Sequence, residues 1–432
     1  MAMRCSLLAL VVAPMLAGAV GVRSAAGQAP PAKAPPALAA LPGMIAERVT
    51  VPGDSSRAFA VYEPSRTVRG AVPPAGGAAR TPVLLVLDPR GRAMEALRLF
   101  APAAEALGWT VISSYNSASD GAEDPNIVAV RDMIEWAQRS LKPDMRRVYI
   151  AGMSGTARAA WLAMADYRPY VAGLFLAAGT TPAPGTELAV AGDRVFSIVA
   201  TTGTGDFNYE EVRRLGETLD SLRAPARVDW FEGPHGWPTA EIVRRALYWF
   251  DVRAMRAGLA PLDSARVRAW LAGEQTRVDS LDHAGQWDLA ERLAVSGARD
   301  AQGWAEGSAL AARASDLAAR PALLALRGRL RRERDRERAQ ALEIERVLAW
   351  ERAQADAPDA DDILKRMGVP ALQQALASAD SVVSGSASRR LARVQVMLAV
   401  YAPAAWERMA RPERAARLRE AARRVNPRRA TP

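Results

Sequence analysis

Hydrophobic and polar positions in the first half of the chain fall into two alternating patterns. Short apolar runs rich in β-branched residues are typical of strands, whereas the longer stretches between them repeat apolar residues three and four positions apart, as amphipathic helices do. Strands are predicted at 46–51, 58–63, 82–87, 109–114, 147–151, 171–177, 194–201 and 227–231, and helices at 93–107, 124–141, 156–166, 209–222 and 239–255. This alternation predicts an α/β domain over 44–258, with a mostly parallel sheet flanked by helices.

From 259 to 432 the strand pattern stops, and Ala, Leu, Arg and Glu recur at helical spacing. We therefore expect a separate all-α domain, broken at Gly273, Gly285, Gly303, Pro321, Pro358, Pro370, Gly385 and Pro403. Segment 284–294 resembles one helix of a tetratricopeptide hairpin, but no clean repeat follows it, so a helical-repeat fold is an open alternative. Segment 327–346 carries opposite charges three and four residues apart, as a solvated helix face or a surface for a protein partner would.

The N-terminal segment follows neither pattern. A short basic region begins at Arg4, residues 7–20 are apolar, and small residues suited to signal peptidase follow at 24–26 and again at 27–29. This predicts a signal peptide over 1–29 and a Pro/Ala linker over 30–43. The apolar run is shorter than the roughly 20 residues that span a bilayer, so we expect an exported periplasmic or extracellular protein without stable membrane insertion after cleavage. An uncleaved membrane anchor is the alternative.

Composition narrows the chemistry. The 432 residues are 50% hydrophobic and 24% charged, as in ordinary globular proteins. The net charge of +10 would suit nucleic acid, but no recognition motif accompanies it, so no nucleic-acid partner is predicted. Cys5 is the only cysteine and lies in the predicted signal peptide, which excludes a cysteine nucleophile in the mature chain. Two histidines without clustered carboxylates or a nucleotide-binding glycine loop predict neither a metal nor a cofactor.

The first candidate for chemistry is a serine at the end of a predicted strand. Residues 152–156 read Gly-Met-Ser-Gly-Thr and lie where strand 147–151 gives way to a helix. A sharp strand-to-helix turn exposes the serine hydroxyl above the sheet edge, and the N–H of the following Gly155 then points at a bound acyl oxygen. Ser154 is therefore the predicted nucleophile, with Thr156 where a last glycine is usual.

A serine hydroxyl needs a base to act as a nucleophile at neutral pH. His235 lies in a Gly/Pro loop directly after the last predicted strand, whereas His283 falls in the helical half. We expect His235 to be the base and Asp206, in a glycine-rich turn after another strand, to orient it. A helix N-cap role is the alternative for Asp206. The fallback acids are Glu210, Asp193 and Asp229.

The order Ser, Asp, His, each after a successive strand, is that of the α/β-hydrolase fold. The segments VYIAGMSGTARAA, TTGTGDFNYEE and FEGPHGWP together look like the exported serine-hydrolase branch of that superfamily, near bacterial esterases and dienelactone-hydrolase-like proteins. The resemblance covers roughly 44–258. It implies an acyl-enzyme on Ser154, base and acid duty for His235, and orientation by Asp206. The site departs from true dienelactone hydrolases, whose nucleophile is a cysteine.

In such enzymes a second oxyanion donor comes from the loop after the third strand. That loop reads Asp-Pro-Arg-Gly-Arg at 88–92. Pro89 has no N–H, so Arg90 or Gly91 is expected to complete the oxyanion hole with Gly155. A guanidinium there would favour an anionic substrate, unless it is a solvated loop charge. The predicted substrate-pocket walls, which plain loop packing would explain equally well, are Tyr115, Asn116, Phe207 and Trp237.

These residues favour an exported serine hydrolase that cleaves a small-molecule ester, of the carboxylesterase type. The intact order of Ser154, Asp206 and His235 supports an enzyme. Thr156 and Pro89 would instead suit a catalytically weak or inactive hydrolase-fold protein that binds a protein partner through its C-terminal helices. A serine peptidase is a further alternative, because no sequence feature separates peptide from ester cleavage.

Overall fold

The computed structural model describes residues 41–65, 80–119, 121–122, 124–141, 143–181, 183 and 185–425. The predicted signal peptide and most of the predicted linker lie outside the described residues. The strands are β1 (Met44–Val51), β2 (Asp54–Glu63), β3 (Val83–Leu87), β4 (Thr110–Ser114), β5 (Val148–Met153), β6 (Val171–Ala177), β7 (Ser197–Gly203) and β8 (Ala226–Phe231). All eight lie where the apolar runs predict them.

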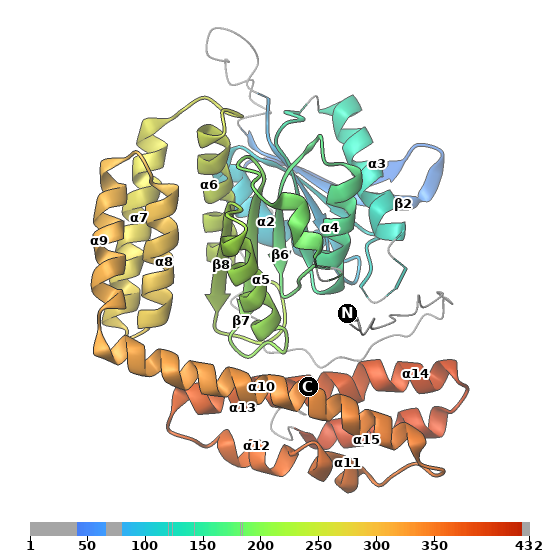
Figure 1. Ribbon diagram of the computed structural model, residues 1–432. Helices are drawn as coiled ribbons and strands as arrows, with labels where there is room; N and C mark the ends of the chain where they lie inside the picture. The colour runs from blue at the N-terminus through green and yellow to red at the C-terminus, as the bar shows by residue number, and fades with distance from the viewer. Residues whose placement is uncertain are drawn as a thin grey trace, which may run out of the picture.

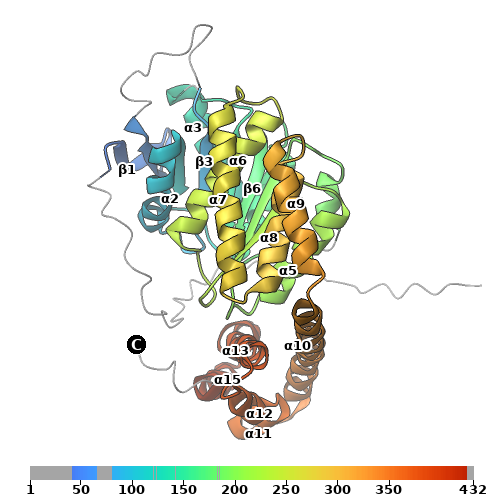
Figure 2. The same cartoon turned by 90° about the vertical axis from the view of Figure 1, so that its left-hand side faces the viewer.

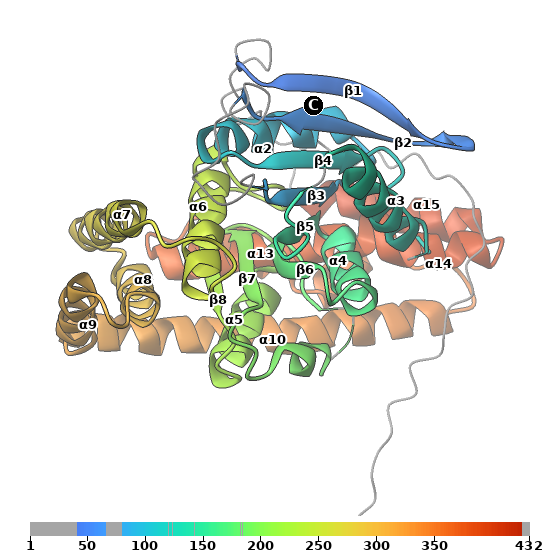
Figure 3. The same cartoon turned by 90° about the horizontal axis from the view of Figure 1, so that it is seen from above.

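The strands form one sheet in the order β1-β2-β4-β3-β5-β6-β7-β8, which Figure 3 shows from above. The β1–β2 and β2–β4 pairs are antiparallel, and every later pair is parallel. The fully buried strands β3 to β7 need apolar residues on both faces, as the sequence pattern indicates. This order and the flanking helices define an α/β-hydrolase fold, as expected.

Helices cover both faces of the sheet (Figure 1). The helices α2 (Ala93–Leu107) and α6 (Ala240–Arg256) bury Leu97 and Val243 in one hydrophobic core. The helices α3 (Asp124–Ser140), α4 (Gly155–Asp166) and α5 (Tyr209–Ser221) bury residues such as Val130 and Val212 in the core on the other face. The carboxyl ends of β3 to β8 therefore meet at one edge, with helices starting from the loops there.

The second half is helical, as predicted. Its helices are α7 (Ser264–His283), α8 (Trp287–Asp300), α9 (Ala305–Ala318), α10 (Pro321–Ala353), α11 (Ala360–Arg366), α12 (Val369–Ala375), α13 (Ser381–Val396), α14 (Ala402–Arg408) and α15 (Pro412–Val425), with a π-helical turn, η3 (Met397–Tyr401), before α14. Among the predicted breaks, those at Gly273 and Gly385 are wrong, because both residues lie inside helices. A single glycine costs a helix only about 1 kcal/mol, which neighbouring packing offsets.

The hydrophobic cores divide at a different place from the predicted boundary at 258. Trp270 and Val278 of α7 and Leu310 of α9 belong to the same core as α2 and α6. A separate core begins at Ile344 in α10 and extends to Val425 in α15. Figure 2 shows α7 to α9 against the α/β part, with the helices that follow α9 in the chain below them. Helices α7 to α9 thus complete the α/β part, and we refer to residues 321–425 as the C-terminal unit.

Candidate active site

Ser154 lies in a strained turn between β5 and α4. Its φ of 57° and ψ of −124° are a conformation that L residues rarely adopt, and the turn is held by the Ser154 N–H, which donates to the Ala177 carbonyl at 2.8 Å. Gly152 leaves the space that the turn needs, because a Cβ there would lie 2.2 Å from the Thr156 carbonyl oxygen. Ser154 itself is half-buried. The backbone thus forms the sharp strand-to-helix turn that the sequence predicts at this position.

Thr156 replaces the usual glycine and adds side-chain hydrogen bonds that hold the turn. Its buried hydroxyl accepts the Met153 N–H at 2.9 Å and lies 2.6 Å from the Leu87 carbonyl oxygen, to which it donates. The side chain thereby joins the end of β5 to the end of β3. The departure from glycine is therefore accommodated by a hydrogen bond that glycine could not make.

The structure brings Asp206 and His235 together. Asp206 Oδ1 lies 2.9 Å from His235 Nδ1, and the carboxylate is fully buried, whereas the imidazole is 22% exposed. The Asp206 loop (204–208) is joined to the His235 loop (232–237) by the Gly205 N–H, which donates to the Gly233 carbonyl at 2.9 Å. The ring of Phe207 stacks on the imidazole at 4.3 Å. A buried carboxylate on Nδ1 fixes the tautomer that leaves Nε2 available as a base.

The three fallback acids are occupied elsewhere. Each forms an ion pair with an arginine: Glu210 with Arg213, Asp193 with Arg168 and Asp229 with Arg245. His283 is exposed on α7, and its ring Nδ1 contacts the Asp279 carbonyl. Among the candidate acids, Asp206 is therefore the one that contacts His235 in the part of the chain that the structure describes.

Hydrogen bonds connect Ser154 with the Asp206 loop across the sheet edge. The Ala177 carbonyl that accepts the Ser154 N–H ends β6, and the next residue, Ala178, donates its N–H to the Thr201 carbonyl of β7 at 2.7 Å. Asn208 donates its side-chain amide to the Ala178 carbonyl at 2.8 Å. Among the described residues no direct Ser154–His235 hydrogen bond is formed, and in substrate-free hydrolases this contact is often long.

The candidate oxyanion donors are all engaged inside the protein. The Gly155 N–H donates to the Ser119 hydroxyl at 3.0 Å. The Arg90 N–H donates to Asp88 Oδ1 at 2.9 Å, and the Gly91 N–H donates to the Asp88 carbonyl at 3.1 Å. This differs from the expected arrangement, because in this conformation the two loop amides point into their own turn. The Ser119 oxygen occupies the place at which Gly155 would meet a substrate oxygen.

Asp88 is a residue of the site that sequence reasoning missed. Its fully buried carboxylate accepts the Trp237 indole N–H at 2.9 Å and the backbone and side-chain N–H groups of Arg92. Trp237 in turn packs edge-on against Phe100, with ring centroids 5.5 Å apart. Trp237, predicted as a pocket wall, therefore ties the His235 loop to the loop after β3. The available signal was an aspartate at the end of a fully apolar strand.

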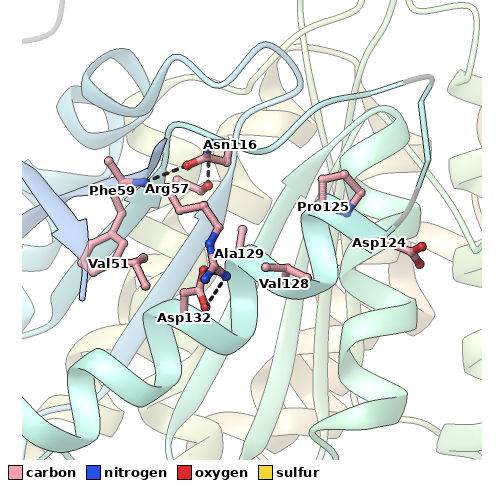
Figure 4. Close-up of a pocket in the computed structure, with 11 residues that line it drawn as sticks. Val51, Arg57, Phe59, Asn116, Asp124, Pro125, Val128, Ala129 and Asp132 are labelled. Carbon is pink, nitrogen blue, oxygen red and sulfur yellow. Dashed lines mark hydrogen bonds and ion pairs between the residues drawn. The ribbon is translucent and has the colours of Figure 1, made fainter. Parts of the chain in front are cut away.

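Tyr115 and Asn116, two other predicted pocket walls, are tied to the β1–β2 hairpin. The Tyr115 hydroxyl donates to the Glu47 carbonyl at 2.7 Å, and burial raises its pKa. The Asn116 side chain accepts the Ala58 N–H at 2.8 Å. Asn116 also lines a cavity of about 340 Å³ between β2, β4 and α3, whose floor holds the Arg57–Asp132 ion pair (Figure 4). Ser154, Asp206 and His235 do not line this cavity.

Within the described part of the chain, no group of three or more His, Cys, Asp or Glu side chains is arranged to hold a metal ion. No described helix is long and apolar enough to cross a membrane.

Comparison with known proteins gives structural likeness only. No family model and no curated protein matches the chain. An esterase from Pyrobaculum calidifontis is 15% identical over 51% of this chain and 87% of its own, with a TM-score of 0.35. The fluorophosphonate-binding serine hydrolase F of Staphylococcus aureus is 15% identical over 48% and 98%, with a TM-score of 0.39. A feruloyl esterase module from Clostridium thermocellum is 14% identical over 54% and 95%, with a TM-score of 0.40. Identities of 14–15% and TM-scores of 0.35–0.40 show no function for this chain, so the function proposed below is inferred from the geometry of the site.

Proposed function

We propose that this protein is an exported serine hydrolase that cleaves small-molecule carboxylic esters. The observation that carries the proposal is the buried Asp206–His235 pair at the same sheet edge as the strained Ser154 turn. Ion pairs and core histidines are common, but a histidine oriented by a buried acid at the same sheet edge as a serine held at positive φ is the arrangement that can activate a hydroxyl.

The reaction follows from the positions of these groups. Ser154 Oγ attacks the ester carbonyl carbon while His235 Nε2 takes the hydroxyl proton. The C–O bond to the alcohol then breaks, and the alkoxide leaves with the proton from His235. Water attacks the acyl carbon with His235 as base, the bond to Ser154 Oγ breaks as His235 returns the proton to it, and the carboxylic acid is released. Asp206 holds Nδ1–H and stabilises the imidazolium formed in both steps.

The tetrahedral intermediate of this reaction needs donors for its oxygen. Gly155 supplies one when the Ser119 hydroxyl gives up its place. A hydroxyl both accepts and donates, so Ser119, within hydrogen-bond distance of the Gly155 nitrogen, is suited to turn and supply the second donor. In the proposal Ser119 takes the role that Arg90 or Gly91 would otherwise fill.

A second candidate function is that of a hydrolase-fold binding protein. The observation in its favour is that the N–H groups of Gly155, Arg90 and Gly91 all donate within the protein. A resting enzyme must then rearrange this loop before its intermediate is stabilised, whereas a binding protein needs no such step.

Hydrolysis of p-nitrophenyl esters of graded acyl length distinguishes the two. The proposal predicts turnover by the wild type, complete loss in Ser154→Ala and His235→Ala, and a reduction on the order of 10⁴ in kcat for Asp206→Asn. His283→Ala is the matched control and should leave turnover unchanged, since His283 is exposed on α7. Turnover that survives in Ser154→Ala would contradict the proposal.

A further inference from the structure

The C-terminal unit contacts the loop that carries Asp206. In Figures 1 and 2 this unit lies across the end of the sheet toward which β7 and β8 run. Its helix α13 donates two hydrogen bonds into the Asp206 loop: Arg389 to the Thr204 carbonyl at 3.1 Å, and Arg393 to the Phe207 carbonyl at 2.7 Å. The two accepting carbonyls bracket Asp206 on either side in the chain.

Both guanidinium groups are themselves fixed. Arg389 pairs with Glu337 of α10 at 2.5 Å, and these side chains are 12% and 10% exposed. Its guanidinium carbon also lies 4.4 Å from the centre of the Tyr209 ring. Arg393 pairs with Glu211 of α5 at 3.0 Å. A guanidinium that is already paired with a carboxylate loses little entropy on binding a carbonyl, so these contacts are stronger than ordinary exposed pairs.

The Asp206 loop lies close to both α13 and the His235 loop. A Cβ on Gly205 would lie 3.3 Å from the Gly233 carbonyl oxygen and 3.8 Å from the Ser388 hydroxyl of α13. A displacement of α13 would therefore be felt at Asp206, which holds the imidazole, and at Phe207, which stacks on it.

The docking of the unit is also electrostatically complementary. Arg338 and Arg334 of α10 approach Glu210 and Glu217 of α5 at 3.2 Å and 3.7 Å. The charges of segment 327–346 thus include a set that faces the α/β part. Helix α5 starts directly after the Asp206 loop, so α10 and α13 act on the same stretch of chain.

We propose that Arg389 and Arg393 are positioning residues that couple the C-terminal unit to the Asp206–His235 pair. The inference rests on the proposed function. The two arginines touch no reacting atom. They hold the carbonyls on both sides of Asp206, so that His235 stays aligned with Ser154 while the proton moves. The C-terminal unit then supports the geometry of the site and is not only an appended binding module.

The test measures how fast a fluorophosphonate labels Ser154 in the full chain. In this step the serine oxygen bonds to phosphorus, fluoride leaves, and the serine proton passes to His235. Arg393→Ala and Arg389→Ala should lower the maximal labelling rate about tenfold to a hundredfold, with little change in the probe concentration at half-maximal rate. Arg393→Lys, which keeps a donor, should recover part of the rate.

Arg390→Ala is the matched control, because Arg390 lies on the same helix but donates to Gln340 of α10 at 2.9 Å. It should label at the wild-type rate. Arg393→Met keeps the alkyl stem and provides the same test if the alanine variant unfolds.

Three results separate the possibilities. If the wild type is labelled and the Arg389, Arg393 and Arg390 variants reach the same maximal labelling rate as the wild type, the coupling is overturned while the proposed function stands. The coupling would also be overturned by a non-specific loss of rate. In that case Arg393→Lys would label as slowly as Arg393→Ala, and the control Arg390→Ala would be equally slow. A folded wild type that takes no label would remove the proposed function and this inference together.

Discussion

The Ser119 hydroxyl accepts the backbone N–H of Gly155 at 3.0 Å, across 36 positions of sequence. Ser119 is held in place because its own N–H donates to the Pro89 carbonyl at 2.9 Å. The residue therefore joins the loop after β4 to the turn that presents Ser154. In the proposed mechanism Ser119 stands where the oxyanion binds, so its substitution distinguishes a donor from an obstruction.

Removal of the Ser119 hydroxyl should slow turnover. If Ser119 supplies the second oxyanion donor, Ser119→Ala lowers kcat about 100-fold, in line with the loss of one such donor elsewhere. Ser119→Thr retains the hydroxyl and should keep much of the activity. Steady-state kinetics with a p-nitrophenyl ester measures both, and a faster Ser119→Ala enzyme would show that the hydroxyl obstructs the hole.

Removal of the Thr156 hydroxyl should destabilise the fold. Thr156→Val keeps the shape but leaves the buried Met153 N–H and Leu87 carbonyl without this partner. The expected loss in the free energy of unfolding is about 1–3 kcal/mol. Urea denaturation followed by tryptophan fluorescence measures it. Thr156→Ser, which keeps the hydroxyl, should lose less, and equal losses in the two variants would argue that the methyl group matters instead.

The buried carboxylate of Asp251 predicts a pH-dependent stability. It accepts the Trp109 indole N–H at 3.0 Å and pairs with Arg266 at 3.0 Å, yet burial raises its pKa to about 6. A carboxyl whose pKa is higher in the folded than in the unfolded state binds more protons when folded, so its contribution falls as pH rises.

From pH 4 to pH 6 this contribution should fall by about 2 kcal/mol, which is most of the total that a shift of roughly two pKa units represents. The stability of the wild type relative to Asp251→Asn should therefore decrease as pH rises through this window. Denaturation of both proteins at pH 4, 5, 6 and 7 measures it, and a difference that grows with pH would have the wrong sign.

Truncation should separate the two cores at α10 and not at residue 258. A fragment 41–258 lacks Glu274 and Asp300, which pair with the fully buried guanidinium of Arg227, and it lacks the α7 residues of the shared core. Without α7 to α9, the apolar face of α6 that they cover would be exposed to water. Fragment 41–258 should show no cooperative thermal transition, whereas fragment 41–320 should unfold cooperatively. The reverse outcome would place the boundary at 258.

The parts of this protein that sequence reasoning found are those with local signals. The central strand β3 is an uninterrupted apolar run, and Ser154 lies in a motif that spans a single turn. His235 is predicted as the base by elimination, because the chain has two histidines. These features depend on residues that are neighbours in the sequence, so a pattern is enough to reveal them.

The contacts that sequence patterns do not predict join residues far apart in the chain. Trp237 and Asp88 are 149 positions apart, and Arg389 and Thr204 are 185 apart. No periodicity records such a pair. The helical pattern after 258 likewise does not predict that α7 packs against the α/β part. An amphipathic pattern shows that one face of a helix is buried, but it does not show which element buries that face.

The most direct test of the central claim is to identify the residue that a fluorophosphonate modifies. The full chain is incubated with the probe, digested, and mapped by mass spectrometry, alongside Ser154→Ala and His235→Ala. The account predicts one adduct, on the peptide that contains Ser154, and no adduct in either variant. An adduct on another residue, or an unlabelled wild type that is fully folded, would contradict it.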